Sequence, residues 1–260
     1  MVNGKKVYFV SDLHLGAPAL GDNRERELLF VDWLKSIRND ASMLFLLGDY
    51  FDFWFEYKKV VPKGYVRSLG ALAEISDSGI PIHFFIGNHD IWAFDYLTKE
   101  LGLIVHRNTM SIELDGKKFF LAHGDDLGEK DFWYQIIKKT FHNRLAQWAL
   151  AKAHPDLTLR LANLWTKQSL LSHKIGDYDF KGLDNEEQVH FAKTVLAKEY
   201  FDYFVFGHRH IAINEEISPG TRLIILGDWI RKFTYGVWDG NEFRIEKIKE
   251  EKIKEFRIKI

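Results

Sequence analysis

The sequence of 260 residues predicts an α/β fold, and three observations support this prediction. Short, continuous apolar runs recur along the chain, and runs of this length are typical of strands buried on both faces. Segments with the apolar spacing of helices lie between these runs, which indicates alternating strands and helices. Five of the runs end at a short polar cluster. The length suits one large domain that carries at most an inserted segment.

The predicted strands and helices alternate over most of the chain. We expect strands at residues 6–10, 43–47, 80–86, 118–122, 201–206, 222–226, 233–238 and 242–248. We expect helices at residues 25–38, 66–77, 92–100 and 185–199. Asp239 and Gly240 form a hairpin turn signal between the last two strands. The final segment mixes apolar and charged residues without a clean period and predicts either a solvated strand or a helical extension.

One segment, from about residue 131 to 181, interrupts this alternation. It contains two amphipathic helical patterns that meet at His154 and Pro155. Residues 129–181 contain nine Lys or Arg and five Asp or Glu, a net charge of +4 in a chain whose net charge is −1. Because the segment lies between two strands that end in polar clusters, we expect an insertion that covers a functional site. Its apolar stripe, with three tryptophans, is either ordinary core or a surface for an anionic, amphiphilic ligand.

The composition excludes several classes of site and partner. The chain has eleven His and no Cys, which rules out disulfides, Cys-ligated zinc, iron–sulfur clusters and a thiol nucleophile. A net charge near zero argues against a general nucleic-acid-binding protein. No apolar run approaches the roughly 18–20 residues that span a bilayer, and residues 1–10 show no signal region. We therefore expect a cytoplasmic protein.

The polar clusters at the ends of five predicted strands carry the chemistry. In chain order they read D-x-H, G-D, G-N-H-D, H-G-D and G-H-x-H. In α/β sheets, ligands collect at the carboxyl ends of the strands. Carboxylates, imidazoles and one amide suit Mn, Fe or Zn. Two such ions about 3.5–4 Å apart would share a bridging carboxylate and activate water for in-line attack on phosphorus. The sequence therefore predicts a dinuclear metal site.

This ordered motif set, from Asp12 to His210, resembles the calcineurin-like metallophosphoesterases. The resemblance implies a single domain over residues 1–260, a four-layer α-β-β-α sandwich of two mixed sheets with a helical lid insertion. It implies one metal held by Asp12, His14, Asp49 and His210, and a second held by Asn88, His123 and His208 with Asp49 as the bridge. It also implies that His89 is catalytic and that Asp90 orients it.

A narrower resemblance links the chain to the UDP-2,3-diacylglucosamine hydrolases of lipid A biosynthesis. It is carried by the S-D-L-H-L-G opening, the G-D-Y-F-D-F segment with Asp52, and the insertion after H-G-D. It implies a lid that accepts acyl chains. The implied substrate-binding residues are Asn88, His89, Asp131, Tyr134, Lys167, His208 and Arg209, with Arg160, Asn163 and Ser169 as other choices on the second lid helix. The chain departs from the best-known members at His89, where they carry Arg, and at Arg209, where they carry Thr.

The resemblance implies a metal-dependent hydrolase that cleaves UDP-2,3-diacylglucosamine at the α-phosphorus, giving UMP and 2,3-diacylglucosamine 1-phosphate (lipid X). Its expected cofactors are two divalent ions, with Mn²⁺ first and Fe or Zn as alternatives. Its expected partners are this substrate and, peripherally, the cytoplasmic face of the inner membrane, without nucleic acid or an obligate protein partner. Two alternatives stay open: a broader phosphodiesterase or phosphatase acting on nucleotides or phosphoproteins, and a non-catalytic scaffold. Asp228 and the six histidines outside the motifs receive no role.

Overall fold

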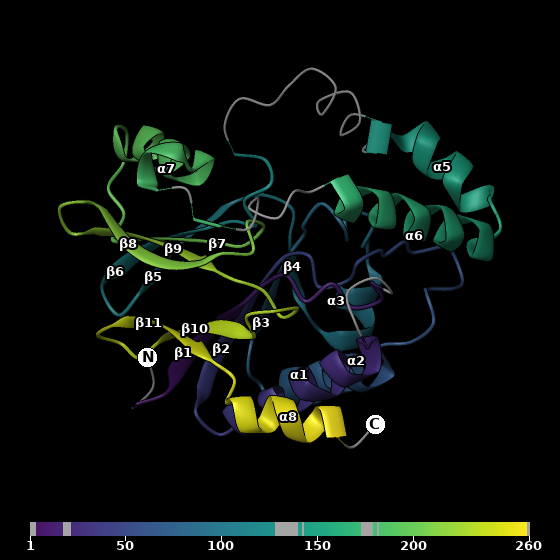
Figure 1. Ribbon diagram of the computed structural model, residues 1–260, viewed down its shortest axis with the longest axis horizontal. Helices are drawn as coiled ribbons and strands as arrows, with labels where there is room; N and C mark the ends of the chain where they lie inside the picture. Colours follow the sequence, from purple (N-terminus) through teal and green to yellow (C-terminus); the bar gives the residue numbers. More distant parts are fainter. Residues whose placement is uncertain are drawn as a thin grey trace.

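The computed structural model describes residues 4–17, 22–127, 140–141, 143–172, 179–180 and 182–258. In these residues, two β-sheets pack face to face and helices cover their outer faces (Figure 1). This confirms the predicted four-layer arrangement. Asp131 and Tyr134, which the sequence assigned to substrate binding, lie outside the described residues.

The first sheet has six strands in the order β11-β10-β1-β2-β3-β4. Strands β1 to β4 pair in parallel, whereas β10 and β11 add antiparallel strands at one edge. The strands are β1 (Lys6–Val10), β2 (Ala41–Leu47), β3 (Ile82–Phe85), β4 (Ile104–His106), β10 (Thr234–Trp238) and β11 (Phe243–Lys247). Its outer face carries α1 (Asn23–Ile37), α2 (Val66–Asp77) and α8 (Glu250–Ile258) (Figure 1).

The second sheet has five strands in the order β5-β6-β7-β9-β8, and α7 (Glu187–Leu196) lies over its outer face (Figure 1). Its strands are β5 (Met110–Leu114), β6 (Lys117–Leu121), β7 (Tyr203–Phe206), β8 (Ala212–Ser218) and β9 (Thr221–Leu226). The space between the sheets is filled by aromatic side chains. Phe9 of the first sheet stacks on Phe45 at 5.0 Å and faces Phe119 of the second at 6.3 Å. This packing fixes the position of the strand ends that carry the motifs.

The structure differs from the predicted pattern of strands and helices at three places. The last segment forms the helix α8, which Lys252 ties to Asp32 of α1 at 2.7 Å. The helix predicted at 92–100 is the shorter α3 (Tyr96–Leu101). It begins late because the buried Glu56 carboxylate accepts hydrogen bonds from the N–H groups of Asp95 and Tyr96. Strands β4, β5 and β8 were not predicted. They lie at sheet edges, and each is either short or carries polar residues among its apolar ones.

The insertion contains two helices, α5 (Arg144–Lys152) and α6 (Pro155–Ser172), which meet at the predicted His154 junction. Trp92 donates a hydrogen bond to the carbonyl of Phe141 at 3.0 Å, so this part of the insertion rests against the loop that follows β3. Large apolar side chains on both helices are exposed: Leu145, Trp148, Leu157, Leu161 and Leu164. Over the described residues, no helix is both long enough and apolar enough to cross a membrane.

Candidate metal centre

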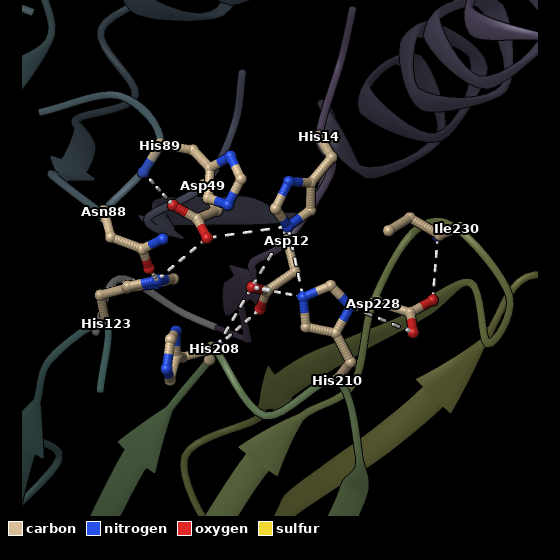
Figure 2. Close-up of polar contacts among 12 residues, drawn as sticks. Asp12, His14, Asp49, Asn88, His89, His123, His208, His210, Asp228 and Ile230 are labelled. Atoms are coloured by element: carbon tan, nitrogen blue, oxygen red, sulfur yellow. Dashed lines mark hydrogen bonds and ion pairs between the residues drawn. The ribbon is translucent and has the colours of Figure 1, made fainter. Parts of the chain in front are cut away.

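The predicted motif residues lie close together in space (Figure 2), and each follows the carboxyl end of one of five strands. Asp12 and His14 follow β1, Asp49 follows β2, and Asn88 and His89 follow β3. His123 follows β6, and His208 and His210 follow β7. Residues almost 200 positions apart therefore lie within contact distance, because both sheets end at the same edge of the sandwich.

The backbone turns sharply where these strands end. Five of the seven proposed ligands have a positive φ, a region that side chains other than glycine seldom adopt. Residues held in this region cluster at functional sites, because the surrounding fold must enforce them. The φ angles are 56° for Asp12, 45° for His14, 52° for Asp49, 68° for His208 and 54° for His210.

Two glycines let the motif backbones approach the buried carboxylates. A Cβ on Gly87 would lie 2.2 Å from Oδ1 of Asp49, and a Cβ on Gly207 would lie 2.7 Å from Oδ2 of Asp12. Backbone N–H groups that follow these glycines donate hydrogen bonds to the same carboxylates. The His89 N–H donates to Asp49 Oδ1 at 2.9 Å, and the His208 N–H donates to Asp12 Oδ2 at 2.9 Å. The glycines of G-N-H-D and G-H-x-H are thus required for close approach.

The donor atoms form two groups that meet at Asp49. In the first, His210 Nε2 lies 3.2 Å from His14 Nε2 and 3.4 Å from Asp12 Oδ1. In the second, His123 Nε2 lies 3.3 Å from Asp49 Oδ2 and 3.4 Å from Asn88 Oδ1, with His208 alongside. The same Asp49 oxygen is 3.7 Å from His14 Nε2, so it faces both groups.

These distances fit a bound cation. Donors about 2.1 Å from a metal lie roughly 3.0 Å apart in an octahedral and roughly 3.4 Å apart in a tetrahedral arrangement. The His123 tautomer gives a second indication. Its Nδ1 donates to the Leu47 carbonyl at 2.7 Å, so the lone pair of Nε2 in the neutral ring faces the Asp49 carboxylate. Two acceptors 3.3 Å apart require a proton or a cation between them.

Asp12, His14, Asp49 and His123 are buried, whereas Asn88, His208 and His210 are half-buried, and this burial shapes the charge of the site. Burial raises the pKa of Asp49, but His123, His89 and His14 outweigh it and hold that pKa well below its usual range. Burial lowers the pKa of His14, and burial together with His123 lowers that of His208 to about 3. These two imidazoles are therefore neutral near pH 7, the form in which histidine binds metals.

Two carboxylates that the sequence did not assign to the site lie behind its histidines. Oδ1 of the buried Asp52 lies 3.6 Å from Nδ1 of His89 and 3.5 Å from Nδ1 of His14. The His89 Nδ1–H donates to the Asp52 backbone carbonyl at 2.7 Å, which leaves Nε2 for the site. Asp228 Oδ2 lies 3.7 Å from Nδ1 of His210 (Figure 2). The only sequence signal for Asp228 is its place directly after a strand.

The structure places Asp90 differently from the role expected for it. Its carboxylate accepts hydrogen bonds from the N–H groups of Gly87 at 2.7 Å and Tyr50 at 2.8 Å. Burial, then the charge of Asp49, raises the pKa of Asp90 to about 7. Asp90 therefore joins the loops that carry Asn88 and Asp49, while the carboxylate beside the His89 ring belongs to Asp52.

Two of the predicted substrate contacts outside the metal cluster have side chains that the structure describes: Arg160, which is exposed on α6, and Arg209. The Arg209 guanidinium forms a two-pronged ion pair with the buried Glu186, at 2.9 and 3.2 Å. Gln188 donates to the Gly207 carbonyl at 3.0 Å in the same region. The start of α7 thus holds the G-H-x-H loop from outside, through residues that no sequence pattern singled out. Lys167 lies in α6, and its side chain, like that of Asn163, is outside the described part.

Comparisons with known proteins agree with this geometry. The calcineurin-like phosphoesterase family model matches residues 5–212. The chain is 41% identical to a UDP-2,3-diacylglucosamine hydrolase of Porphyromonas gingivalis over 94% of this chain and 98% of that protein. It is 27% identical to the enzyme of that name from Actinobacillus succinogenes (86% of this chain, 92% of the relative) and 29% identical to that of Vibrio vulnificus (85% and 88%). The chain belongs to the calcineurin-like phosphoesterase family.

Proposed function

We propose that this protein is a metal-dependent hydrolase that cleaves UDP-2,3-diacylglucosamine at the α-phosphorus, releasing UMP and 2,3-diacylglucosamine 1-phosphate. The proposal rests on one observation: two groups of His and Asp donors share Asp49, in a chain that matches hydrolases of that name over nearly its whole length. Scaffold proteins of such a fold need none of these donors, whereas all seven expected ligand positions are filled here.

The donor set suggests how the site would be loaded. We assign Asp12, His14 and His210 to one divalent ion and Asn88, His123 and His208 to the other, with Asp49 between them. When bound, the ions supply a water of lowered pKa and neutralise the phosphoryl oxygens. Oxygen and imidazole donors without thiolate suit Mn²⁺, our first choice, and also Fe or Zn.

The other residues of the site hold and move protons around the phosphate. His89 offers a ring nitrogen within 4.8 Å of donor atoms of His14 and Asp49. Its Nδ1–H is fixed on the Asp52 carbonyl, and the pKa of His89 is raised because Asp49 and Asp52 outweigh the effect of burial. We assign His89 the role of protonating the leaving phosphate oxygen from Nε2, with Asp52 stabilising the charged ring.

The exposed apolar side chains of α5 and α6 support a lipid substrate. Leu157, Leu161 and Leu164 lie three or four residues apart on α6 and are 53–63% exposed, and Leu145 and Trp148 are exposed on α5. Exposed apolar patches of this kind mark ligand, protein or membrane contacts. Basic residues accompany them, including Lys152, whose ammonium lies 5.9 Å from the Trp148 ring. We propose that these helices receive the acyl chains and dock on the anionic inner-membrane surface.

A direct assay tests the function. Purified protein with Mn²⁺ and UDP-2,3-diacylglucosamine is expected to release UMP, and in ¹⁸O-labelled water the label is expected in UMP because attack occurs at the α-phosphorus. Asp49→Ala should lose this activity, whereas Asp77→Ala, an exposed position at the end of α2, should retain it. Turnover of small chromogenic diesters without UMP release would instead indicate the broader phosphodiesterase.

A further inference from the structure

A cavity opens directly beside the second group of donors. It has a volume of about 340 Å³, within the range of small-molecule sites. His123 and Gly87 form its inner wall, next to Asp49 and Asn88. The loop from β4 to β5 forms its outer rim, and Phe191 of α7 closes one side. The cavity therefore adjoins the metal centre at His123.

We propose that this cavity binds the nucleoside half of the substrate, an inference that rests on the proposed function. The reacting α-phosphorus is joined to the ribose through a single ester oxygen. The acyl chains are separated from that phosphorus by a second phosphate and by the glucosamine ring. With the phosphate at the donor groups, the nucleoside is thus the nearer of the two large parts of the substrate, and the adjoining cavity is placed to receive it.

The lining of the cavity fits a nucleoside better than an acyl chain. Ile86 and Phe191 offer apolar surface for a flat base, while Asn108 and Thr109 on the exposed rim offer an amide and a hydroxyl. Asp125, Asp126 and Arg107 add charged groups to the polar side. Each carboxylate has roughly four lone-pair sites, so it can accept ribose hydroxyls in addition to its existing contacts.

The same carboxylates disfavour hydrocarbon in this cavity. Covering a charged group with an acyl chain removes its hydration without replacing the lost hydrogen bonds, which is strongly unfavourable. The exposed apolar faces of α5 and α6 provide a surface without that penalty. The structure thus separates the two halves of the substrate, with the nucleoside beside His123 and the lipid at the inserted helices.

The test uses UMP as a competitive inhibitor of chromogenic diester hydrolysis by the Mn²⁺-loaded protein, with ribose 5-phosphate for comparison. UMP and ribose 5-phosphate share the ribose and its 5-phosphate, so the uracil base is the part that distinguishes them. UMP should inhibit more strongly than ribose 5-phosphate in the native protein. Asn108→Ala and Thr109→Val should each weaken UMP inhibition by about 5-fold, the effect of one lost hydrogen bond. Thr109→Trp, which fills the rim, should remove the advantage of UMP. Asn241→Ala, in the exposed turn between β10 and β11, is the matched control and should behave as the native protein.

The possible outcomes are distinct. Equal inhibition by UMP and ribose 5-phosphate in the native protein would overturn the assignment, as would unchanged UMP inhibition in Thr109→Trp. A dependence of KM on acyl-chain length that changes in the rim variants, with UMP inhibition unaltered, would place the lipid here and also overturn it. If UDP-2,3-diacylglucosamine is not cleaved but the rim variants still weaken UMP inhibition, the proposed substrate is wrong and the nucleoside site stands.

Discussion

Replacing Glu186 by Ala removes the carboxylate that holds the guanidinium of Arg209. The pair makes two charged hydrogen bonds, at 2.9 and 3.2 Å. The Glu186 side chain is 1% exposed and that of Arg209 is 24% exposed, so the energy of this ion pair should lie between those of exposed pairs and of fully buried pairs. Exposed ion pairs contribute roughly 0–1 kcal/mol, and breaking a fully buried pair costs about 3–5 kcal/mol. Because Arg209 can still reach water, we expect Glu186→Ala to lower the free energy of unfolding by about 2 kcal/mol.

Urea unfolding followed by tryptophan fluorescence measures this change, and Arg209→Gln completes a double-mutant cycle. The two substitutions should be strongly non-additive, and Glu186→Gln, which keeps the shape and one of the two acceptor oxygens, should cost less than Glu186→Ala. Additive effects would refute the claim that this ion pair stabilises the loop. Kinetics separate the two roles of Arg209. If it acts by holding the loop of His208 and His210, both variants should change KM alike, whereas direct phosphate binding predicts a larger rise for Arg209→Gln.

Three further predictions concern the remaining charged groups. Asp52→Asn should lower kcat at saturating Mn²⁺ by about 10–100-fold, since the Asp52 carboxylate supports the charged His89 ring; an unchanged kcat would contradict this. Mn²⁺ at about 100 times its Kd should raise the free energy of unfolding by about 2.7 kcal/mol per site, and calorimetry should show no such gain for Asp49→Ala. Burial, then His106, lowers the pKa of His83 to about 4, against about 6.5 when unfolded, so the unfolded chain binds the proton first as pH falls. His83 should therefore leave the free energy of unfolding unchanged above pH 6.5 and lower it by about 2 kcal/mol toward pH 4, allowing for partial solvent access of the ring. His83→Phe should remove this part of the dependence of stability on pH.

The closeness of the proposed donor residues could be predicted from the sequence because their position follows from a local rule. A polar motif directly after a buried parallel strand must lie at the carboxyl edge of the sheet, whatever the rest of the chain does. Asp228 also follows a strand, but in the sequence it could equally be a turn residue. Its carboxylate does stabilise a turn, because it accepts hydrogen bonds from the N–H groups of Ile230, Arg231 and Lys232. Its position beside His210 depends on how β7 and β9 pair, which no local pattern encodes.

Other features depended on packing between distant segments. The pairing of Glu186 with Arg209 joins the start of a helix to a loop 23 positions later and leaves no periodic signal. Strand β8 was missed because its apolar residues Ile213 and Ile217 flank the polar run of Asn214, Glu215 and Glu216, as suits a partly exposed edge strand. The late start of α3 likewise depends on Glu56, about forty residues before the helix.

The left-handed backbone at five of the proposed ligands implies a conflict between the stability of the fold and its activity. Each such residue costs on the order of 1 kcal/mol relative to glycine, so the metal centre is a concentrated source of instability that the packed sheets must offset. Replacing His210 by Gly would relax the backbone at that position while deleting a donor, so the apo protein could gain stability as function is lost. Selection for thermal stability alone would therefore act against this site.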